Sequence, residues 1–267
     1  MKTILLLVHD DEGQEARLQA ALDVTRAVEG HLTCLDVAIM PELMGDYYSG
    51  AGAAMLLEDE RARESANRTR TEARLAHEDV PWDWHEMLGG AAECLRSASA
   101  LADLIVVNRR FEAIGSPVVA ALAGEVVLSA HKPILAVPAT SRGMDCAGHA
   151  MVAWNGSLSA SAALRAAAPL LKLAGEVTIV EVSDGPVERP AEEAAAYLAH
   201  HGIKPVVRVL SNRGAAPATV LLDEVTDRDP AYLVMGGFGH RRFVEALLGG
   251  VTRTMLNHSP VPLLMAH

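Results

Sequence analysis

The stretch GEVTIVEVS at residues 175–183 decides the fold, because nearly the same pattern stands earlier in the chain as GHLTCLDVA at residues 30–38. In both copies a glycine opens a run of mostly apolar and β-branched residues, which is typical of a buried strand. A second pair of similar segments lies fewer positions apart in the sequence: ADLIVVN at residues 102–108 corresponds to PAYLVMG at residues 230–236. Repeats this far apart indicate two tandem domains and not a solenoid of short units.

The two copies also end alike, and this sets the boundaries of the two predicted domains. HKPILAV at residues 131–137 corresponds to SPVPLLM at residues 259–265. Between the copies, residues 140–149 contain Ser, Arg, Gly and Asp without hydrophobic periodicity, as expected of a linker. We therefore predict one domain over residues 1–140 and a second over residues 149–267.

Each copy alternates short apolar runs with longer segments of helical character, and this alternation predicts the fold class. Parallel strands need crossover connections, and helices on both faces of the sheet supply them. We predict an α/β fold in which each domain is a doubly wound, five-stranded parallel sheet. In the second copy the predicted strands are 150–154, 176–182, 206–210, 232–235 and 262–266, and the predicted helices are 158–173, 191–201, 218–226 and 251–257.

Two helical segments carry more specific expectations. Pro169 is expected to end or kink the helix 158–173 early, because proline cannot donate a backbone hydrogen bond. In the first copy, residues 56–78 are crowded with Glu, Asp and Arg. We expect this segment to be a solvated helix face with favourable charge pairs four residues apart, such as Glu64 with Arg68.

The composition excludes several classes of protein. The 267 residues are 50% hydrophobic and 21% charged, which is globular, and the formal net charge of −11 argues against broad nucleic-acid binding. Cys34, Cys94 and Cys146 are too few and too scattered for a disulfide framework, which favours a reducing cytosol. No apolar run reaches the roughly 20 residues of a membrane helix, and the run at 4–8 is too short for a signal segment. We expect a cytoplasmic protein with no nucleic-acid or membrane partner.

Glycines near the end of the chain form the candidate site for chemistry. Gly236 and Gly239 follow a predicted strand, and Gly249 and Gly250 stand at the start of the last predicted helix. Glycines let the backbone approach a ligand, their successive N–H groups bind anions, and a helix N-terminus favours phosphate. Thr252 adds a hydroxyl group. The residues alone leave open the alternative that these glycines only form turns and a helix start.

The spacing of these glycines resembles the ATP-binding signature of the universal stress protein family, which reads Gly, two residues, Gly, nine residues, Gly and then Ser or Thr. Gly236, Gly239 and Gly249 stand at that spacing, but Gly250 replaces the hydroxyl residue, for which Thr252 or the backbone of Gly250 is expected to compensate. The resemblance covers nearly the whole chain. It implies two universal-stress-protein-like, Rossmann-related domains, with ATP, and Mg²⁺ allowed beside it, as the ligand of the second.

The family's other contacts fall on further residues of the second copy. The resemblance implies that Asn155 meets adenine, where the family has Asp, although Asn155 also fits an ordinary turn before a helix. We expect no catalytic residue and no metal ligand. The full set implied for the nucleotide is Ala153, Asn155, Val182, Met235, Gly236, Gly239, His240, Gly249, Gly250, Val251 and Thr252.

The first copy departs from the signature. It has Asp10 at the position matched to Asn155, but residues 108–111 read NRRF, without the glycines of the second copy. We expect this copy not to bind ATP in the family's manner. Arg109 and Arg110 are expected to be a solvated pair, with an anion contact as the alternative.

The resemblance implies a cytosolic stress-response regulator that binds ATP in its second domain and acts by switching instead of turnover. Two alternatives stay open: a slow ATPase or nucleotidyl transferase, against which no evident base, nucleophile or P-loop lysine is found, and an interaction module that binds no nucleotide. Domains of the family pair through their last strands. Residues 134–137 and 263–266 are therefore expected to pair within the chain as a pseudo-dimer, which leaves a further homodimer open.

Overall fold

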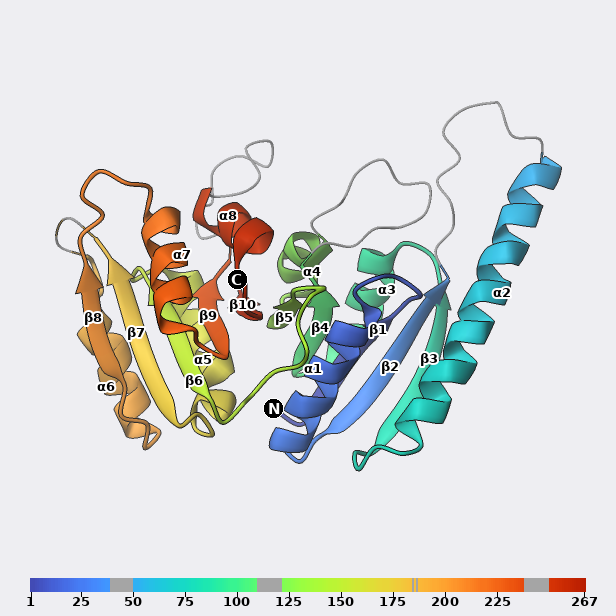
Figure 1. The fold of residues 1–267 in the computed structure, drawn as a ribbon, viewed down its shortest axis with the longest axis horizontal. Helices are drawn as coiled ribbons and strands as arrows, with labels where there is room; N and C mark the ends of the chain where they lie inside the picture. Colours follow the sequence, from blue (N-terminus) through green and yellow to red (C-terminus); the bar gives the residue numbers. More distant parts are fainter. Residues whose placement is uncertain (39–49, 110–121, 184, 186, 238–249) are drawn as a thin grey trace.

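The computed structural model describes residues 1–38, 50–109, 122–183, 185, 187–237 and 250–267. Ten strands form one continuous sheet in the order β3-β2-β1-β4-β5-β10-β9-β6-β7-β8 (Figure 1). The strands are β1 (Thr3–Val8), β2 (His31–Ala38), β3 (Trp82–Leu88), β4 (Leu104–Asn108), β5 (Ile134–Val137), β6 (His149–Trp154), β7 (Glu176–Val182), β8 (Val206–Leu210), β9 (Tyr232–Gly236) and β10 (Leu263–Ala266). The helices are α1 (Gln14–Ala27), α2 (Gly50–Leu75), α3 (Ala91–Ala98), α4 (Leu122–Ala130), α5 (Leu158–Leu171), α6 (Ala191–His200), α7 (Pro217–Arg228) and α8 (Gly250–His258), with a short 3₁₀ helix η1 (Ser99–Leu101).

The sheet consists of two parallel halves joined by one antiparallel pair. We call residues 1–140 the first half and residues 149–267 the second half. Strands β1–β5 pair in parallel within the first half, and β6–β10 do so within the second. The junction is β5 against β10, where Leu135 lies opposite Leu264 in antiparallel register. The pairing that the sequence predicts between these two strands is therefore present.

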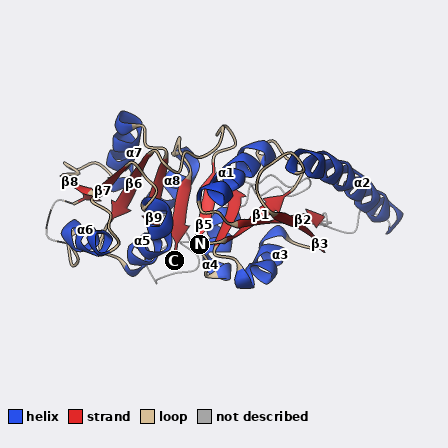
Figure 2. Ribbon diagram, turned by 90° about the horizontal axis from the view of Figure 1, so that it is seen from below, coloured by secondary structure: helices blue, strands red, loops and turns tan. Residues whose placement is uncertain are grey.

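Helices cover both faces of the sheet, which gives the molecule two hydrophobic cores. One core lies under α1, α2, α5 and α6, and the other lies under α3, α4, α7 and α8. Figure 2 shows helices on both sides of the strands. The four central strands β4, β5, β9 and β10 are almost entirely buried, as parallel strands with two covered faces are. The predicted α/β, doubly wound fold class is confirmed.

The second half matches its predicted elements closely. All nine predicted elements are present, and none of their ends moves by more than two residues. Pro169 lies inside α5, however, and the helix runs on to Leu171, so the expected early end is wrong. Proline here costs one backbone hydrogen bond near the end of the helix, and Leu170 and Leu171 continue the buried face. No helix of the described residues is both long enough and apolar enough to cross a membrane.

Helix α2 differs from the solvated helix face that the sequence predicts. Its face toward the sheet carries a buried stripe, on which Glu64, Asn67 and Thr71 are at most 4% exposed. The predicted pairing of Glu64 with Arg68 is not made, because Arg68 bonds Glu72 on its own helix instead. The segment predicted to be a solvated face therefore docks on the first half through polar side chains.

Candidate functional site

The strand order of the second half reverses between β6 and β9. From β6 the chain builds outward to β7 and β8 and then returns to add β9 and β10 on the other side. In open parallel sheets, ligands bind beyond the carboxyl ends of the strands at such a point. Ala153 pairs with Met235, so the ends of the two strands lie side by side. The predicted site residues Asn155 and Gly236 stand at these two ends.

Gly236, the last residue of β9, packs directly against the start of α5. A Cβ atom at this position would lie 2.5 Å from the backbone nitrogen of Ala160 and 2.7 Å from the carbonyl carbon of Ser159. Both neighbours are backbone atoms, which cannot swing aside as a flexible side chain can. Only glycine lets β9 end this close to α5, which gives a structural reason for the first glycine of the predicted signature.

Gly236→Ala is therefore expected to lower the free energy of unfolding by about 1–3 kcal/mol, because the new methyl group overpacks the junction. Gly250→Ala is the matched control. Among the described residues, no atom lies within 4 Å of a Cβ built at Gly250, and alanine is the better helix former. Urea unfolding followed by far-UV circular dichroism measures both, and equal losses would contradict the close packing of Gly236.

The first residues of α8 differ in exposure. Gly250 is exposed, whereas Thr252 is buried and Val251 packs partly against the core. The first N–H groups of a helix have no intrahelical acceptor and form the positive end of its dipole. As far as the described residues go, this end therefore offers donors and space to an anion. The predicted residues Gly239, His240 and Gly249 lie outside the described residues.

The loop after β6 is held in a defined shape. Asn155 is exposed, and its Oδ1 accepts a hydrogen bond from the backbone N–H of Ser157 at 3.2 Å. Ser157 in turn caps α5, accepting from the N–H of Ala160 at 3.1 Å. Gly156 has φ of +72° and packs against the backbone of Arg189. The amide oxygen of Asn155 accepts this bond, and its Nδ2, which has no acceptor among the described residues, is a donor available to a ligand.

Three of the predicted site residues offer a ligand only their backbone. The side chains of Ala153, Val182 and Met235 all pack toward the same hydrophobic core. Beside Val182, Glu181 is buried, and its Oε2 accepts from the N–H of Ala191 at 2.9 Å, which caps the start of α6. Sequence reasoning missed Glu181, which reads as one polar residue inside a strand.

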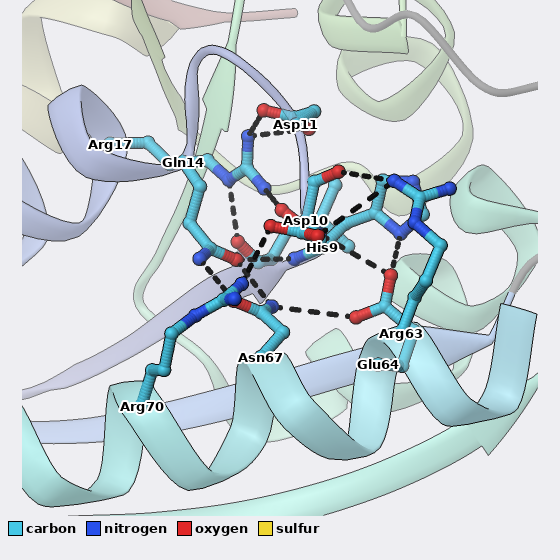
Figure 3. A network of polar contacts seen from close by, with 10 residues as sticks. His9, Asp10, Asp11, Gln14, Arg17, Arg63, Glu64, Asn67 and Arg70 are labelled. Atoms are coloured by element: carbon cyan, nitrogen blue, oxygen red, sulfur yellow. Dashed lines mark hydrogen bonds and ion pairs between the residues drawn. The ribbon is translucent and has the colours of Figure 1, made fainter.

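The equivalent edge of the first half is filled by its own polar side chains (Figure 3). The His9 ring Nδ1 lies 2.5 Å from Glu64 Oε1, and both side chains are buried. The amides of Gln14 and Asn67 exchange two hydrogen bonds, at 2.6 and 2.7 Å, and the N–H of Asp10 donates to Glu64. Burial alone would raise the pKa of Glu64, but the hydrogen bonds and charge of these neighbours outweigh burial and lower it. Helix α2 thus closes this edge.

Arg17 is a fully buried cation next to the same network of polar side chains. Its guanidinium donates to the carbonyls of Leu7 and His9, both at 2.7 Å, and to the carboxylate of Asp11 at 2.6 Å. It also bonds Asn108, which ends β4 where Gly236 ends β9. Sequence reasoning missed Arg17, and the one available signal was an arginine on the otherwise apolar face of α1.

Asp10 does not take the place of Asn155 in this edge. The strands place His9, directly after β1, opposite Asn155, directly after β6. By its hydrogen bonding, however, Asp11 is the counterpart of Asn155. Asp11 Oδ1 accepts a bond from the backbone N–H two residues later at 2.8 Å, and Asn155 Oδ1 accepts the equivalent bond at 3.2 Å. Asp10 falls between the two because the loop after β1 is longer, so the sequence match of Asp10 to Asn155 is not reproduced.

The carboxylate of Asp10 is engaged by α2. Arg70 Nη2 lies 2.9 Å from Asp10 Oδ1, and Arg63 Nη2 lies 3.8 Å from Oδ2. Both arginines come from the helix whose buried stripe covers this edge, as Figure 3 shows. A base that approached Asp10 would have to displace these two ion pairs.

Asp36 of β2 lies beside the end of β1 and is buried. Its Oδ1 has no hydrogen-bond partner among the described residues. Burial raises the pKa of Asp36 to about 7, and the charges of Glu64 and Glu86 add to that rise. His9 and Arg68 oppose it. This carboxyl therefore changes its charge close to neutral pH.

Arg109 is not the solvated residue that the sequence predicts. It is half-buried, and its Nη1 donates to the carbonyl of Leu256 in α8 at 3.0 Å. The first half thus reaches into the helix that begins the candidate site of the second half. Arg110 lies outside the described residues.

Comparisons with known proteins agree with this architecture. The model of the universal stress protein family matches residues 148–267. No curated protein sequence matches the chain. Among solved structures, the chain is similar to a universal stress protein from Archaeoglobus fulgidus DSM 4304, at 18% identity and a TM-score of 0.73, over 99% of this chain and 95% of that one.

Two structures from Pseudomonas aeruginosa are similar over the same length. One is a functionally unknown protein from strain PAO1, at 14% identity and a TM-score of 0.56, over 100% of this chain and 92% of that one. The other is a putative universal stress protein from strain UCBPP-PA14, at 15% identity and a TM-score of 0.53, over 100% of this chain and 93% of that one. Likeness at these identities shows a shared fold.

Proposed function

We propose that the chain is a member of the universal stress protein family, whose model matches residues 148–267, that its second half binds ATP, and that the protein is a nucleotide-dependent regulator of the stress response. The observation that carries this proposal is the exposed Gly250 at the start of α8, with no described atom within 4 Å of its Cβ position, in the half whose strand order reverses between β6 and β9. The protein acts by binding ATP more tightly in one conformation than in another, which shifts the balance between them.

The described residues fit a nucleotide at this edge. The triphosphate lies at the first turn of α8, where the backbone of Gly250 and the hydroxyl of Thr252 provide donors, with Mg²⁺ as its counter-ion. The base lies toward Asn155, whose Nδ2 is free to donate because its oxygen is used by the turn. The backbones of Ala153, Val182 and Met235 line the strand ends between them.

The equivalent edge of the first half is built differently, which supports placing the nucleotide in the second half only. Its switch point is occupied by Asn108 where the second half has Gly236, and the Asn108 amide donates to the carbonyl of Gly13 at 3.1 Å. The buried pair of His9 and Glu64 lies at the same edge, between the end of β1 and α2. A nucleotide would have to displace a connected polar network here, so one site per chain is proposed.

Isothermal titration calorimetry with ATP and Mg²⁺ tests the proposal on three proteins. The wild type is expected to bind one ATP per chain. Gly250→Glu is expected to raise the Kd by at least about tenfold, because a carboxylate at the helix start competes with the phosphates and repels them. Gly250→Ala, which adds a methyl group to the same open space, is expected to change the Kd by less than about threefold.

The controls separate binding from folding. Both variants keep the far-UV circular dichroism spectrum of the wild type, since the space above Gly250 is open among the described residues. Wild-type protein that gives no heat of binding at millimolar ATP would overturn the proposal in favour of an interaction module. ATP binding that is unaffected by Gly250→Glu would place the nucleotide elsewhere.

A further inference from the structure

Arg109, which directly follows β4, connects the two halves. Its guanidinium Nη1 donates to the carbonyl oxygen of Leu256 at 3.0 Å, across 147 positions of sequence. Its backbone N–H donates to the carbonyl of Val137 at 3.0 Å, which fixes the root of the side chain on β5. The contact therefore runs from the first half, past the β5–β10 junction, into α8.

The acceptor lies in the helix that carries the proposed phosphate end. Leu256 comes four residues after Thr252, which is about one helical turn. Its carbonyl is one of the last four of α8, which have no donor within the helix. A guanidinium at this end satisfies that carbonyl and complements the negative end of the helix dipole. Arg109 thus holds the opposite end of the helix from the phosphates.

Helix α8 depends on such contacts for its position. It has nine residues, Gly250–His258, of which Thr252, Met255 and Leu256 are buried. A helix this short is not stable by itself, and tertiary packing decides where it lies. Loss of the bond to Leu256 would release the C-terminal end of the helix. Thr252 lies one turn before Leu256, so it would move with the helix.

The end of β9 in the second half also lies next to the first half. Gly237 follows β9 as Arg109 follows β4, and its N–H donates to the carbonyl of Ala266 on β10 at 2.8 Å. A Cβ atom at Gly237 would lie 3.4 Å from Val127 Cγ1 of α4, so this backbone borders the first half. The strand end that carries Gly236 and the helix that starts at Gly250 are both in contact with the first half.

We infer that Arg109 is a positioning residue for the nucleotide site of the second half, so that ATP affinity there depends on a residue of the first half. This inference rests on the proposed function. Coupling between sites is reciprocal. If the docked position of α8 favours ATP, then bound ATP stabilises the contact of α8 with Arg109 and, through it, the ends of β4 and β5.

The first experiment measures the Kd of ATP by calorimetry in three variants. Arg109→Ala is expected to raise the Kd by about tenfold, because it removes a hydrogen bond from a charged donor. Arg109→Lys keeps a cationic donor and is expected to stay within about threefold of the wild type. Arg96→Ala, which removes an exposed arginine from α3 of the same half, is the matched control and leaves the Kd unchanged.

The second experiment uses hydrogen exchange with and without ATP. In the wild type, saturating ATP is expected to slow exchange in α8 and also in β4 and β5. In Arg109→Ala, ATP at a concentration that saturates the site protects the second half only. A purely structural role for Arg109 would not produce this loss of long-range protection.

The outcomes distinguish the inference from the function on which it rests. A wild type that does not bind ATP contradicts the proposed function. If the wild type binds ATP but ATP slows hydrogen exchange in the second half only, the positioning role of Arg109 is overturned. This outcome needs no variant. An unchanged Kd in Arg109→Ala overturns it as well, and leaves the proposed function standing.

Discussion

Arg17→Met is expected to lower the free energy of unfolding by about 3–5 kcal/mol. The guanidinium is fully buried and donates to the carbonyls of Leu7 and His9, to Asp11 and to Asn108. Burial lowers the pKa of Arg17, and the charge and hydrogen bond of Asp11 compensate in part. Methionine has a similar length but donates nothing, so a carboxylate, an amide oxygen and two carbonyls lose the hydrogen bonds that the guanidinium donates inside the protein.

Arg26→Met on the same helix is the matched control. Arg26 also forms ion pairs, with Glu78 at 3.0 Å and Asp79 at 2.7 Å, but its side chain is 40% exposed. Exposed pairs contribute little, and the expected loss is below about 1 kcal/mol. Urea unfolding at pH 7, followed by far-UV circular dichroism, compares the two variants. Similar losses would show that burial of Arg17 is not the source of its effect.

The second half could be predicted from the sequence because its local signals agree with its final environment. β7 and β8 are apolar runs that end at polar or turn residues, and their observed bounds are the predicted ones. The glycine spacing also predicted a site role for Gly236, which stays a prediction; the contact that the structure shows, with the start of α5, involves residues far earlier in the chain. That contact depends on the tertiary arrangement and has no local signature.

The network of the first half could not be predicted for the same reason. Glu64 and Asn67 look like surface residues of a charged helix, and Arg17 is bonded to Asn108, which stands 91 positions away. One signal was available: the charged part of α2 lacks a broad apolar stripe, so burial of apolar side chains alone does not explain how it packs on the sheet. Reading Glu64, Asn67 and Thr71 as one stripe at helical spacing would have indicated the buried face.

Asp36→Asn is expected to raise the free energy of unfolding by about 2–4 kcal/mol at pH 8 and to leave it nearly unchanged at pH 4. Burial, and then the charges of Glu64 and Glu86, raise the pKa of Asp36 from 3.8 to about 7. A carboxyl with a raised pKa binds its proton more tightly in the folded chain. Its contribution to stability is therefore complete below about pH 4 and is lost as the pH rises through about 7. Asparagine is neutral throughout and avoids this loss.

Asp103→Asn is a control of opposite sign. The backbone N–H groups of Lys2 and Thr3 donate to Asp103 Oδ2 at 2.6 and 3.1 Å, and these bonds lower its pKa. Its contribution is present at neutral pH and is lost as the pH falls, so this variant is destabilised at pH 7 and less so in acid. Urea unfolding midpoints from pH 4 to pH 8 measure both. If the gain from Asp36→Asn stayed constant over that range, ionisation of Asp36 would not be its cause.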